Sequence, residues 1–128
     1  MMNVDARPPR VSIHAAARAA QHRGSSVDEE QLRCDPQLAA RYRRAVMRLY
    51  RRSHPAFVVD ETSGIWTNLA ATRALVIAGG EVVTVVAADP GGAFGAAKIA
   101  SMATRLRARL AERFGRGDTP ATGGRRCR

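Results

Sequence analysis

A histidine, two arginines and a threonine supply the side chains that cleavage of RNA without a metal ion would require. His14 and Arg18 lie four residues apart in an alanine-rich segment. Arg73 precedes the apolar run 74–78, and Thr84 lies within the valine-rich run 82–86. Near neutral pH the histidine could take the ribose 2′-hydroxyl proton or protonate the leaving oxygen. The arginines and the hydroxyl could stabilise the charge of the phosphorane. These four residues are our candidate catalytic site.

Structural roles are the alternative for these residues and for two others. A lone histidine in an alanine-rich helix is commonly a surface residue, and threonine is an ordinary strand former. His22 lies near the end of the same predicted helix, where the helix dipole favours an imidazolium, and we expect it to be structural. Trp66, the only tryptophan, is either a core residue or a platform for base stacking, and we favour the core.

The chain is strongly basic, with 21 Lys and Arg against 11 Asp and Glu and a formal net charge of +10. Such a charge attracts polyanions and speeds association with them. Lys98 is the only lysine, and arginine suits bidentate contacts to phosphate. A GC-rich genome would also enrich arginine together with alanine, so the composition alone leaves both explanations open.

The segment 37–52 is predicted to form an amphipathic helix with one basic face. Its apolar residues recur at spacings of three and four, as in Leu38, Tyr42 and Leu49. No acidic residue lies between Gln37 and His54. The candidate nucleic-acid-binding residues on this face are Arg41, Arg44, Arg48, Arg51 and Arg52. The alternative is that these arginines form an ordinary charged helix face that contacts only solvent.

The order of periodicities predicts an α+β fold with N-terminal helices, a small antiparallel sheet and a C-terminal helix. The first helix is expected from Ser12, a natural N-cap, to Gly24, a natural residue after a helix end. Ser26 and Glu29 have the spacing of a capping box and predict the start of a second, short helix.

Short β-branched runs predict the sheet over about residues 56–88. Strands are expected near 56–60, 64–68, 73–78 and 81–87, the last two joined by a tight turn at Gly79 and Gly80. A final helix is expected at about 94–114. Its buried stripe is predicted to contain Ile99, Met102, Leu106 and Leu110.

The length of 128 residues fits one domain, which we place at 11–114. Residues 1–10 are predicted to be a flexible leader because Pro8 and Pro9 disfavour a helix. Residues 115–128, rich in Gly, Thr and Arg, are predicted to be a disordered basic tail.

Two parts of the chain resemble the barnase–EndoU–colicin–RelE group of metal-independent ribonucleases and toxin-like domains. The segment from Ser12 to Gly24 is similar to that group's His-Ala-x-x-Arg-x-x-x-Arg-Gly opening, with one extra residue after Arg18. The hairpin 74–87 looks like its last strand pair, in which a Thr or Ser often joins the active site. The resemblance implies roles for His14 and Arg18 by motif position and for Thr84 by its strand, whereas Arg73 is added for its chemistry.

These observations predict a small RNA-targeting protein, a metal-independent ribonuclease-like effector or toxin in the cytoplasm. One alternative is a non-catalytic nucleic-acid-binding protein borne by a phage or mobile element. A second is a structural or interaction protein that becomes ordered on an acidic partner. We expect RNA to be favoured over DNA as partner, and a toxin of this kind would have a cognate inhibitor protein as a second partner.

Neither a metal, a cofactor nor a membrane partner is expected. Cys34 and Cys127 form no metal-binding motif, and two isolated cysteines are consistent with a reducing compartment. The first ten residues lack the apolar stretch of a signal peptide. The longest apolar run is far too short to span a membrane.

Overall fold

In the computed structural model, which describes residues 8–116, the alanine-rich segment forms helix α1 (Ile13–His22). Ser12 caps it as predicted, its Oγ accepting a hydrogen bond from the Ala15 backbone N at 3.0 Å. The same hydroxyl donates to the Val83 carbonyl at 3.1 Å, which fixes the helix start on the sheet. Gly24 follows the helix end with a φ of +85°, the left-handed conformation that glycine adopts readily.

Helices α2 (Glu29–Cys34) and α3 (Pro36–Arg51) come next, separated from each other only by Asp35. The cap of α2 is Asp28, which forms a capping box with Gln31, so the predicted Ser26–Glu29 box is wrong by two residues. Ser26 does not reach the helix because Ser25 and Val27 form a local turn, the Val27 N donating to the Ser25 Oγ at 3.2 Å.

Four consecutive antiparallel strands confirm the predicted sheet: β2 (Ser53–Asp60), β3 (Ser63–Asn68), β4 (Arg73–Ala78) and β5 (Glu81–Ala87). The predicted turn between β4 and β5 is present. Gly79 and Gly80 have φ values of +57° and +77°, as a two-residue hairpin turn of type I′ requires.

A fifth strand, β1 (Arg10–Val11), was not predicted. It pairs in parallel with β5 through Glu81 and Val82, so the sheet is mixed, with the order β1-β5-β4-β3-β2. Arg10 therefore belongs to the sheet rather than to the predicted leader. Two residues are too few to show a strand period, and the pairing depends on a partner far along the chain.

Helix α4 (Ala96–Arg116) extends slightly beyond its predicted end and includes the first two residues of the predicted tail. The rest of that tail, residues 117–128, and residues 1–7 of the predicted leader lie outside the described residues. The predicted apolar stripe of α4 is confirmed, because Ile99, Met102 and Leu106 are buried against the sheet and Leu110 is half-buried.

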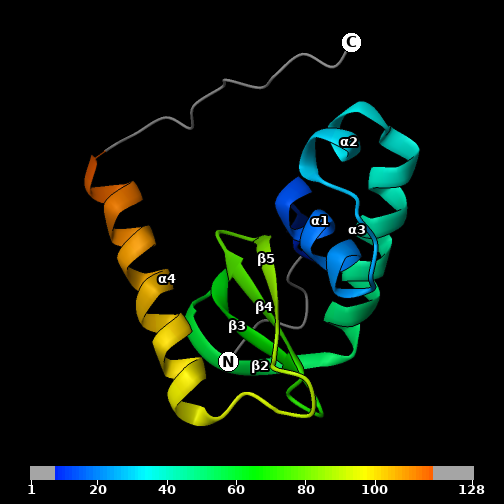
Figure 1. Cartoon of the computed structure of the whole chain (residues 1–128). Coiled ribbons are helices and arrows are strands. Elements are labelled where there is room, and N and C mark those ends of the chain that lie inside the picture. Colours follow the sequence, from blue (N-terminus) through cyan, green and yellow to red (C-terminus); the bar gives the residue numbers. More distant parts are fainter. Residues whose placement is uncertain (1–7, 117–128) are drawn as a thin grey trace.

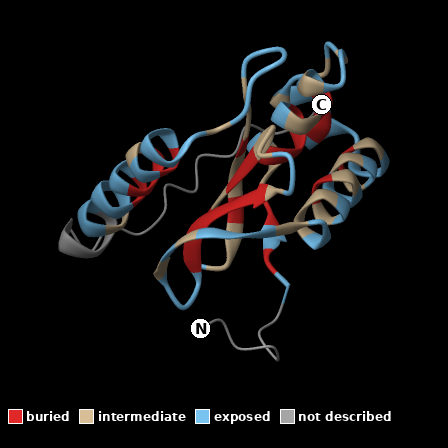
Figure 2. Ribbon diagram, turned by 90° about the horizontal axis from the view of Figure 1, so that it is seen from below, coloured by how far each residue is buried: buried red, intermediate tan, exposed pale blue. Residues whose placement is uncertain are grey.

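The helices cover the sheet from both sides, with α1, α2 and α3 on one face and α4 on the other (Figure 1). The buried residues follow the sheet and the inner sides of the helices (Figure 2). Trp66 is only 3% exposed and belongs to the core on the α1–α3 face, which confirms the core role favoured above. The face on which a strand residue lies therefore decides which helices it meets.

Gly64 in β3 provides a test of this packing. A Cβ added there would lie 2.5 Å from the Phe57 carbonyl oxygen and 2.8 Å from Cζ3 of Trp66. We expect Gly64→Ala to lower the free energy of unfolding by about 1–3 kcal/mol, the usual cost of overpacking. Urea denaturation measures the loss, with Gly95→Ala as control because its Cβ would meet no atom within 4 Å. Equal unfolding midpoints for the two variants would contradict the packing described.

Candidate nucleic-acid interface

A pocket of about 310 Å³ lies where the end of α1, the middle of α3 and the start of β4 meet. We call it the α1–β4 pocket. Its lining has an apolar part, which we call the wall, and a polar and cationic part, which we call the rim. The wall consists of Ala19, Ala45, Leu49 and Val85, and the rim of His22, Arg23, Asn68, Thr72 and Arg73.

His22 is the titratable side chain of this pocket whose pKa departs from its ordinary value. Burial lowers the pKa of His22 below 6.5, and the positive charges of Arg18 and Arg73 lower it further. These effects outweigh the helix dipole, which favours the imidazolium, so the ring is neutral at pH 7. The structural role expected for His22 stays a prediction, but the ring does not carry the positive charge that the helix dipole favours.

The Nδ1 atom of His22 is buried and has no hydrogen-bond partner among residues 8–116. A buried N–H without an acceptor is less well tolerated than a buried acceptor without a donor. The favoured neutral tautomer therefore carries its proton on Nε2, where the imidazole is a hydrogen-bond donor. His22 thus offers a neutral donor close enough to Arg18 and Arg73 for their charges to lower its pKa.

Arg73 is held by the loop that joins β3 to β4. The Asn68 Oδ1 accepts hydrogen bonds from the backbone N of Thr72 at 2.9 Å and of Arg73 at 3.0 Å, and its Nδ2 donates to the Thr72 Oγ1 at 2.8 Å. The Arg73 Nη1 donates to the Thr72 carbonyl at 3.0 Å. Within the described residues, no partner occupies the other guanidinium nitrogens of Arg73, so these remain available to an anion.

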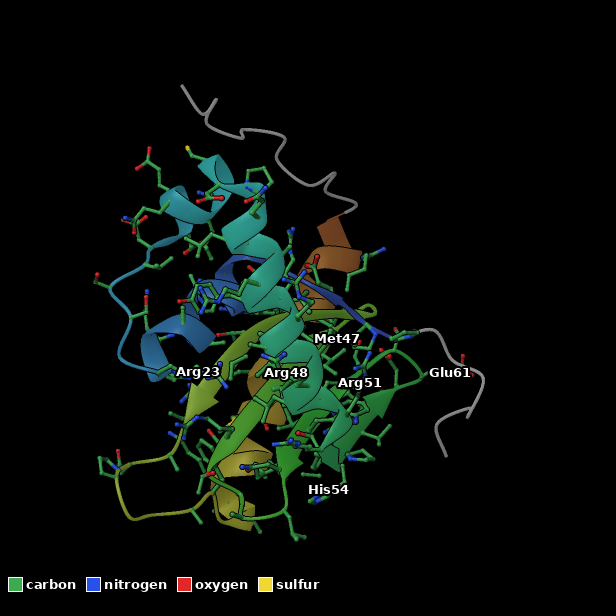
Figure 3. The ribbon with its side chains drawn as sticks, turned by 90° about the vertical axis from the view of Figure 1, so that its right-hand side faces the viewer. Arg23, Met47, Arg48, Arg51, His54 and Glu61 are labelled. Carbon is green, nitrogen blue, oxygen red and sulfur yellow. The ribbon has the colours of Figure 1, made fainter. Side chains whose placement is uncertain are left out.

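The predicted basic face of α3 lies on the outside of the molecule beside this pocket. We call its five exposed residues the α3 arginine face; they are Arg41, Arg44, Arg48, Arg51 and Arg52. Throughout residues 8–116, no carboxylate lies within 4.0 Å of their guanidinium groups. Figure 3 shows Arg48 and Arg51 on the same side of the molecule as Arg23. Because Arg48 follows Ala45 by three residues, it stands next to the pocket wall.

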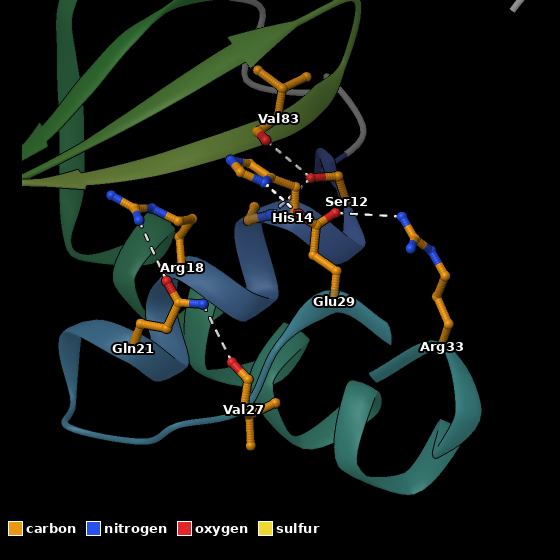
Figure 4. A network of polar contacts seen from close by, with 9 residues as sticks. Ser12, His14, Arg18, Gln21, Val27, Glu29, Arg33 and Val83 are labelled. Atoms are coloured by element: carbon orange, nitrogen blue, oxygen red, sulfur yellow. Dashed lines mark hydrogen bonds and ion pairs between the residues drawn. The ribbon is translucent and has the colours of Figure 1, made fainter. Parts of the chain in front are cut away.

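His14 does not reach the pocket. Its side chain is 48% exposed, and its Nδ1 lies 3.0 Å from the Glu29 Oε2, while the other oxygen of Glu29 accepts from Arg33 at 3.3 Å (Figure 4). Eight residues separate His14 from His22, which corresponds to about 12 Å along a helix. His14 therefore joins α1 to α2, whereas the Arg18 Nη1 donates to the Gln21 Oε1 at 3.3 Å nearer the pocket.

Thr84 lies on the opposite face of the sheet from Arg73. Thr84 pairs with Val76, which packs against the core beneath α4, and paired residues of neighbouring strands share a face. Arg73 lines the pocket on the α1–α3 side. The structure thus brings Arg18 and Arg73 to His22, and it does not bring His14 and Thr84 to them.

The sequence contained a signal for His22 that composition alone did not reveal. Arg18 and His22 are four residues apart, so they lie on one side of α1. Only the packing of α1 against α3 and β5, next to the loop that leads into β4, brings Arg73 near and buries the ring, and that packing is a long-range feature.

A scan against protein-family models gave no match for this chain, and searches of curated proteins and of solved structures gave none either. Among residues 8–116, no three His, Cys, Asp or Glu residues gather as metal ligands would. None of the helices in this part of the chain combines the length and apolar character needed to cross a bilayer. The α1–β4 pocket and the α3 arginine face are therefore the features from which a function can be inferred.

The lowered pKa of His22 predicts how stability changes with pH. Because the folded-state pKa lies below the ordinary 6.5, the unfolded chain binds the proton more readily just below pH 6.5. The free energy of unfolding should therefore fall as the pH falls through this range. Between about pH 7.5 and 5.5, the free energy of unfolding should fall less in His22→Gln than in the wild type. Urea denaturation at both pH values measures this difference. His54→Gln, at an exposed position, is the control, and an equal fall in all three proteins would contradict the prediction.

Proposed function

We propose that this chain is a nucleic-acid-binding protein that targets RNA. The observation that carries the proposal is the α3 arginine face, whose five exposed guanidinium groups have no carboxylate partner among the described residues. Arginines without internal partners can each bind a phosphate, and release of counterions then drives association. Arg23 and Arg73 continue the positive charge to the pocket.

RNA is favoured over duplex DNA by the character of the pocket. Proteins recognise RNA largely through unpaired bases, which a stacked duplex does not present, and through the 2′-hydroxyl, which DNA lacks. The α1–β4 pocket supplies a concave site for such groups next to the backbone-binding face. A flat basic surface without a pocket would offer no such preference.

Salt dependence tests the binding proposal. Fluorescence anisotropy of a labelled single-stranded RNA would give the affinity between about 50 and 200 mM salt. Contacts of five arginines to five phosphates predict a slope of log K against log salt of about −3 to −4. A slope near zero would contradict backbone binding and leave the arginine face merely solvated.

A second candidate function is metal-independent ribonuclease activity, as in an effector or toxin with a cognate inhibitor in the cytoplasm. It is favoured by a neutral imidazole at pH 7 near Arg18 and Arg73, because a neutral imidazole can accept a proton and arginines stabilise a phosphorane. Two features of the pocket rank it second. The favoured tautomer of His22 carries the proton on Nε2, and no carboxylate of residues 8–116 lines the pocket to act as the second acid–base group.

Incubation with RNA in EDTA tests the second candidate. Attack by the ribose 2′-hydroxyl would leave a 2′,3′-cyclic phosphate, which chromatography and mass spectrometry detect. DNA, which lacks this hydroxyl, should bind and survive. Intact RNA after prolonged incubation would eliminate the ribonuclease candidate and leave the binding function.

A further inference from the structure

We propose that the α1–β4 pocket holds one unstacked nucleotide of a bound RNA strand, with the base against the apolar wall and the phosphate at the cationic rim. This inference rests on the proposed RNA-binding function and adds the chemical identity of what enters the pocket. A volume of about 310 Å³ lies at the lower end of the range of small-molecule sites, about 300–1,000 Å³.

The wall and the rim of the pocket suit chemically different groups, which one ligand could carry together. Ala45 and Leu49 from α3 and Val85 from β5 offer aliphatic surface without a polar side chain. Arg23 and Arg73 offer positive charge on the rim. A ligand that satisfies both needs a flat, weakly polar part joined closely to an anion, as a nucleotide has.

His22, which also lines the pocket, adds a neutral hydrogen-bond donor. Since Nδ1 is buried without a partner in the described chain, the proton is favoured on Nε2, which can donate to a phosphate or hydroxyl oxygen. Burial and the two arginine charges lower the pKa of His22, but an arriving phosphate would oppose that effect. Phosphate binding should therefore raise the pKa of His22.

The pocket has little side-chain amide with which to read a base. The Asn68 Oδ1 accepts from two backbone N–H groups, and one of the two Nδ2 hydrogens is donated to the Thr72 hydroxyl. A single amide donor is left, and an acceptor on any base could use it. Bases are usually distinguished by hydrogen bonds along their edges. The pocket should therefore accept purines and pyrimidines with similar affinity, while it excludes a base that remains stacked in a duplex.

A comparison of single-stranded and duplex RNA of one sequence tests the inference. At equal salt we expect the single strand to bind at least about tenfold more tightly, equivalent to about 1.4 kcal/mol. Ala45→Leu fills the pocket from α3 and should reduce this preference to less than about twofold without changing the salt slope. Ala40→Leu is the matched control, because Ala40 is half-buried on the same helix but does not line the pocket.

Equal affinity of the wild type for single-stranded and duplex RNA would overturn the inference. A preference for the single strand that persists in folded Ala45→Leu would overturn it as well.

A second variant covers the outcome in which Ala45→Leu does not fold. Arg73→Gln should weaken single-strand binding at least about tenfold, as loss of a charge-assisted hydrogen bond does, and should leave duplex binding nearly unchanged. Adenosine and uridine 3′-monophosphate, titrated against the wild type, should each shift the His22 imidazole resonances and raise its pKa. Unshifted resonances, or equal effects of Arg73→Gln on both RNAs, would overturn the inference. If only the preference for single-stranded over duplex RNA is absent, the proposed RNA-binding function still stands. If RNA affinity does not depend on the α3 arginine face, the proposed function itself is wrong.

Discussion

Replacing Arg44, Arg48 and Arg51 together by glutamine is expected to weaken RNA binding about 100-fold near 100 mM salt and to make the salt slope shallower by about 2. All three side chains are exposed on the outer side of α3, and each lost phosphate contact removes about 0.7 from the slope for a single strand. Glutamine retains the length and helical propensity of the side chain, so the fold should be unaffected. Anisotropy titrations at several salt concentrations measure both quantities.

A charge-matched control exists on the other side of the sheet. Lys98, Arg105 and Arg109 are exposed on α4, and α4 covers the sheet face opposite to α3 (Figure 1). Their replacement by glutamine removes the same net charge without touching the α3 arginine face. We expect this control to change the slope little. Equal losses in the two triple variants would mean that net charge attracts RNA without a defined face.

The helices and the antiparallel strands could be predicted because their signals are local. Leu38, Tyr42 and Leu49 show the period of a helix, and Gly79 and Gly80 mark the hairpin turn. The same periodicity located the exposed arginines of α3, because a residue opposite an apolar stripe must face solvent. The cap at Asp28 was missed because Ser26 offered the same three-residue spacing.

The place of Thr84 in the candidate catalytic site could not be predicted because it depended on the register of the hairpin. Near its turn, Ala78 pairs with Glu81 and Ile77 with Val82, and a regular ladder would continue with Thr84 opposite Leu75, on the face of Arg73. An irregularity between Val76 and Ile77 shifts the pairing by one residue, so Thr84 lies opposite Val76. One extra residue in a ladder turns the side chains beyond it to the other face.

The position of His22 in a pocket was not predicted because it also depends on contacts between distant parts of the chain. Its position at the end of α1 is readable from the sequence, but its burial depends on α3 and on the loop that Asn68 organises. Such contacts join residues more than forty positions apart, as between His22 and Arg73, and no local pattern specifies them. The pocket therefore became visible only with the tertiary structure.

The final prediction distinguishes the site expected from the sequence from the site found in the structure. In the ribonuclease candidate, we expect His22→Gln to lower the rate of RNA cleavage about 100- to 10,000-fold, the contribution of a positioned acid–base group. The glutamine amide keeps a hydrogen-bond donor but cannot transfer a proton at neutral pH, so RNA affinity should change little. Single-turnover cleavage in EDTA, with RNA affinity measured in parallel, separates the two effects.

Thr84→Val and His14→Gln are the matched comparisons in the same assay. Thr84 faces the α4 side of the sheet and His14 contacts Glu29, so neither substitution should change cleavage more than about twofold, whereas a loss of acid–base catalysis is far larger. A large loss of cleavage rate in the His14 or Thr84 variant, with no loss in the His22 variant, would instead support the catalytic site inferred from the sequence. Residues from both faces of the sheet would then have to contribute to that site. The wild-type protein could leave RNA intact while the α3 arginine face still governs RNA affinity. The pocket would then bind its nucleotide without cleaving the strand. The physical reason would be that a single neutral imidazole lacks the second group required for proton transfer to the leaving oxygen.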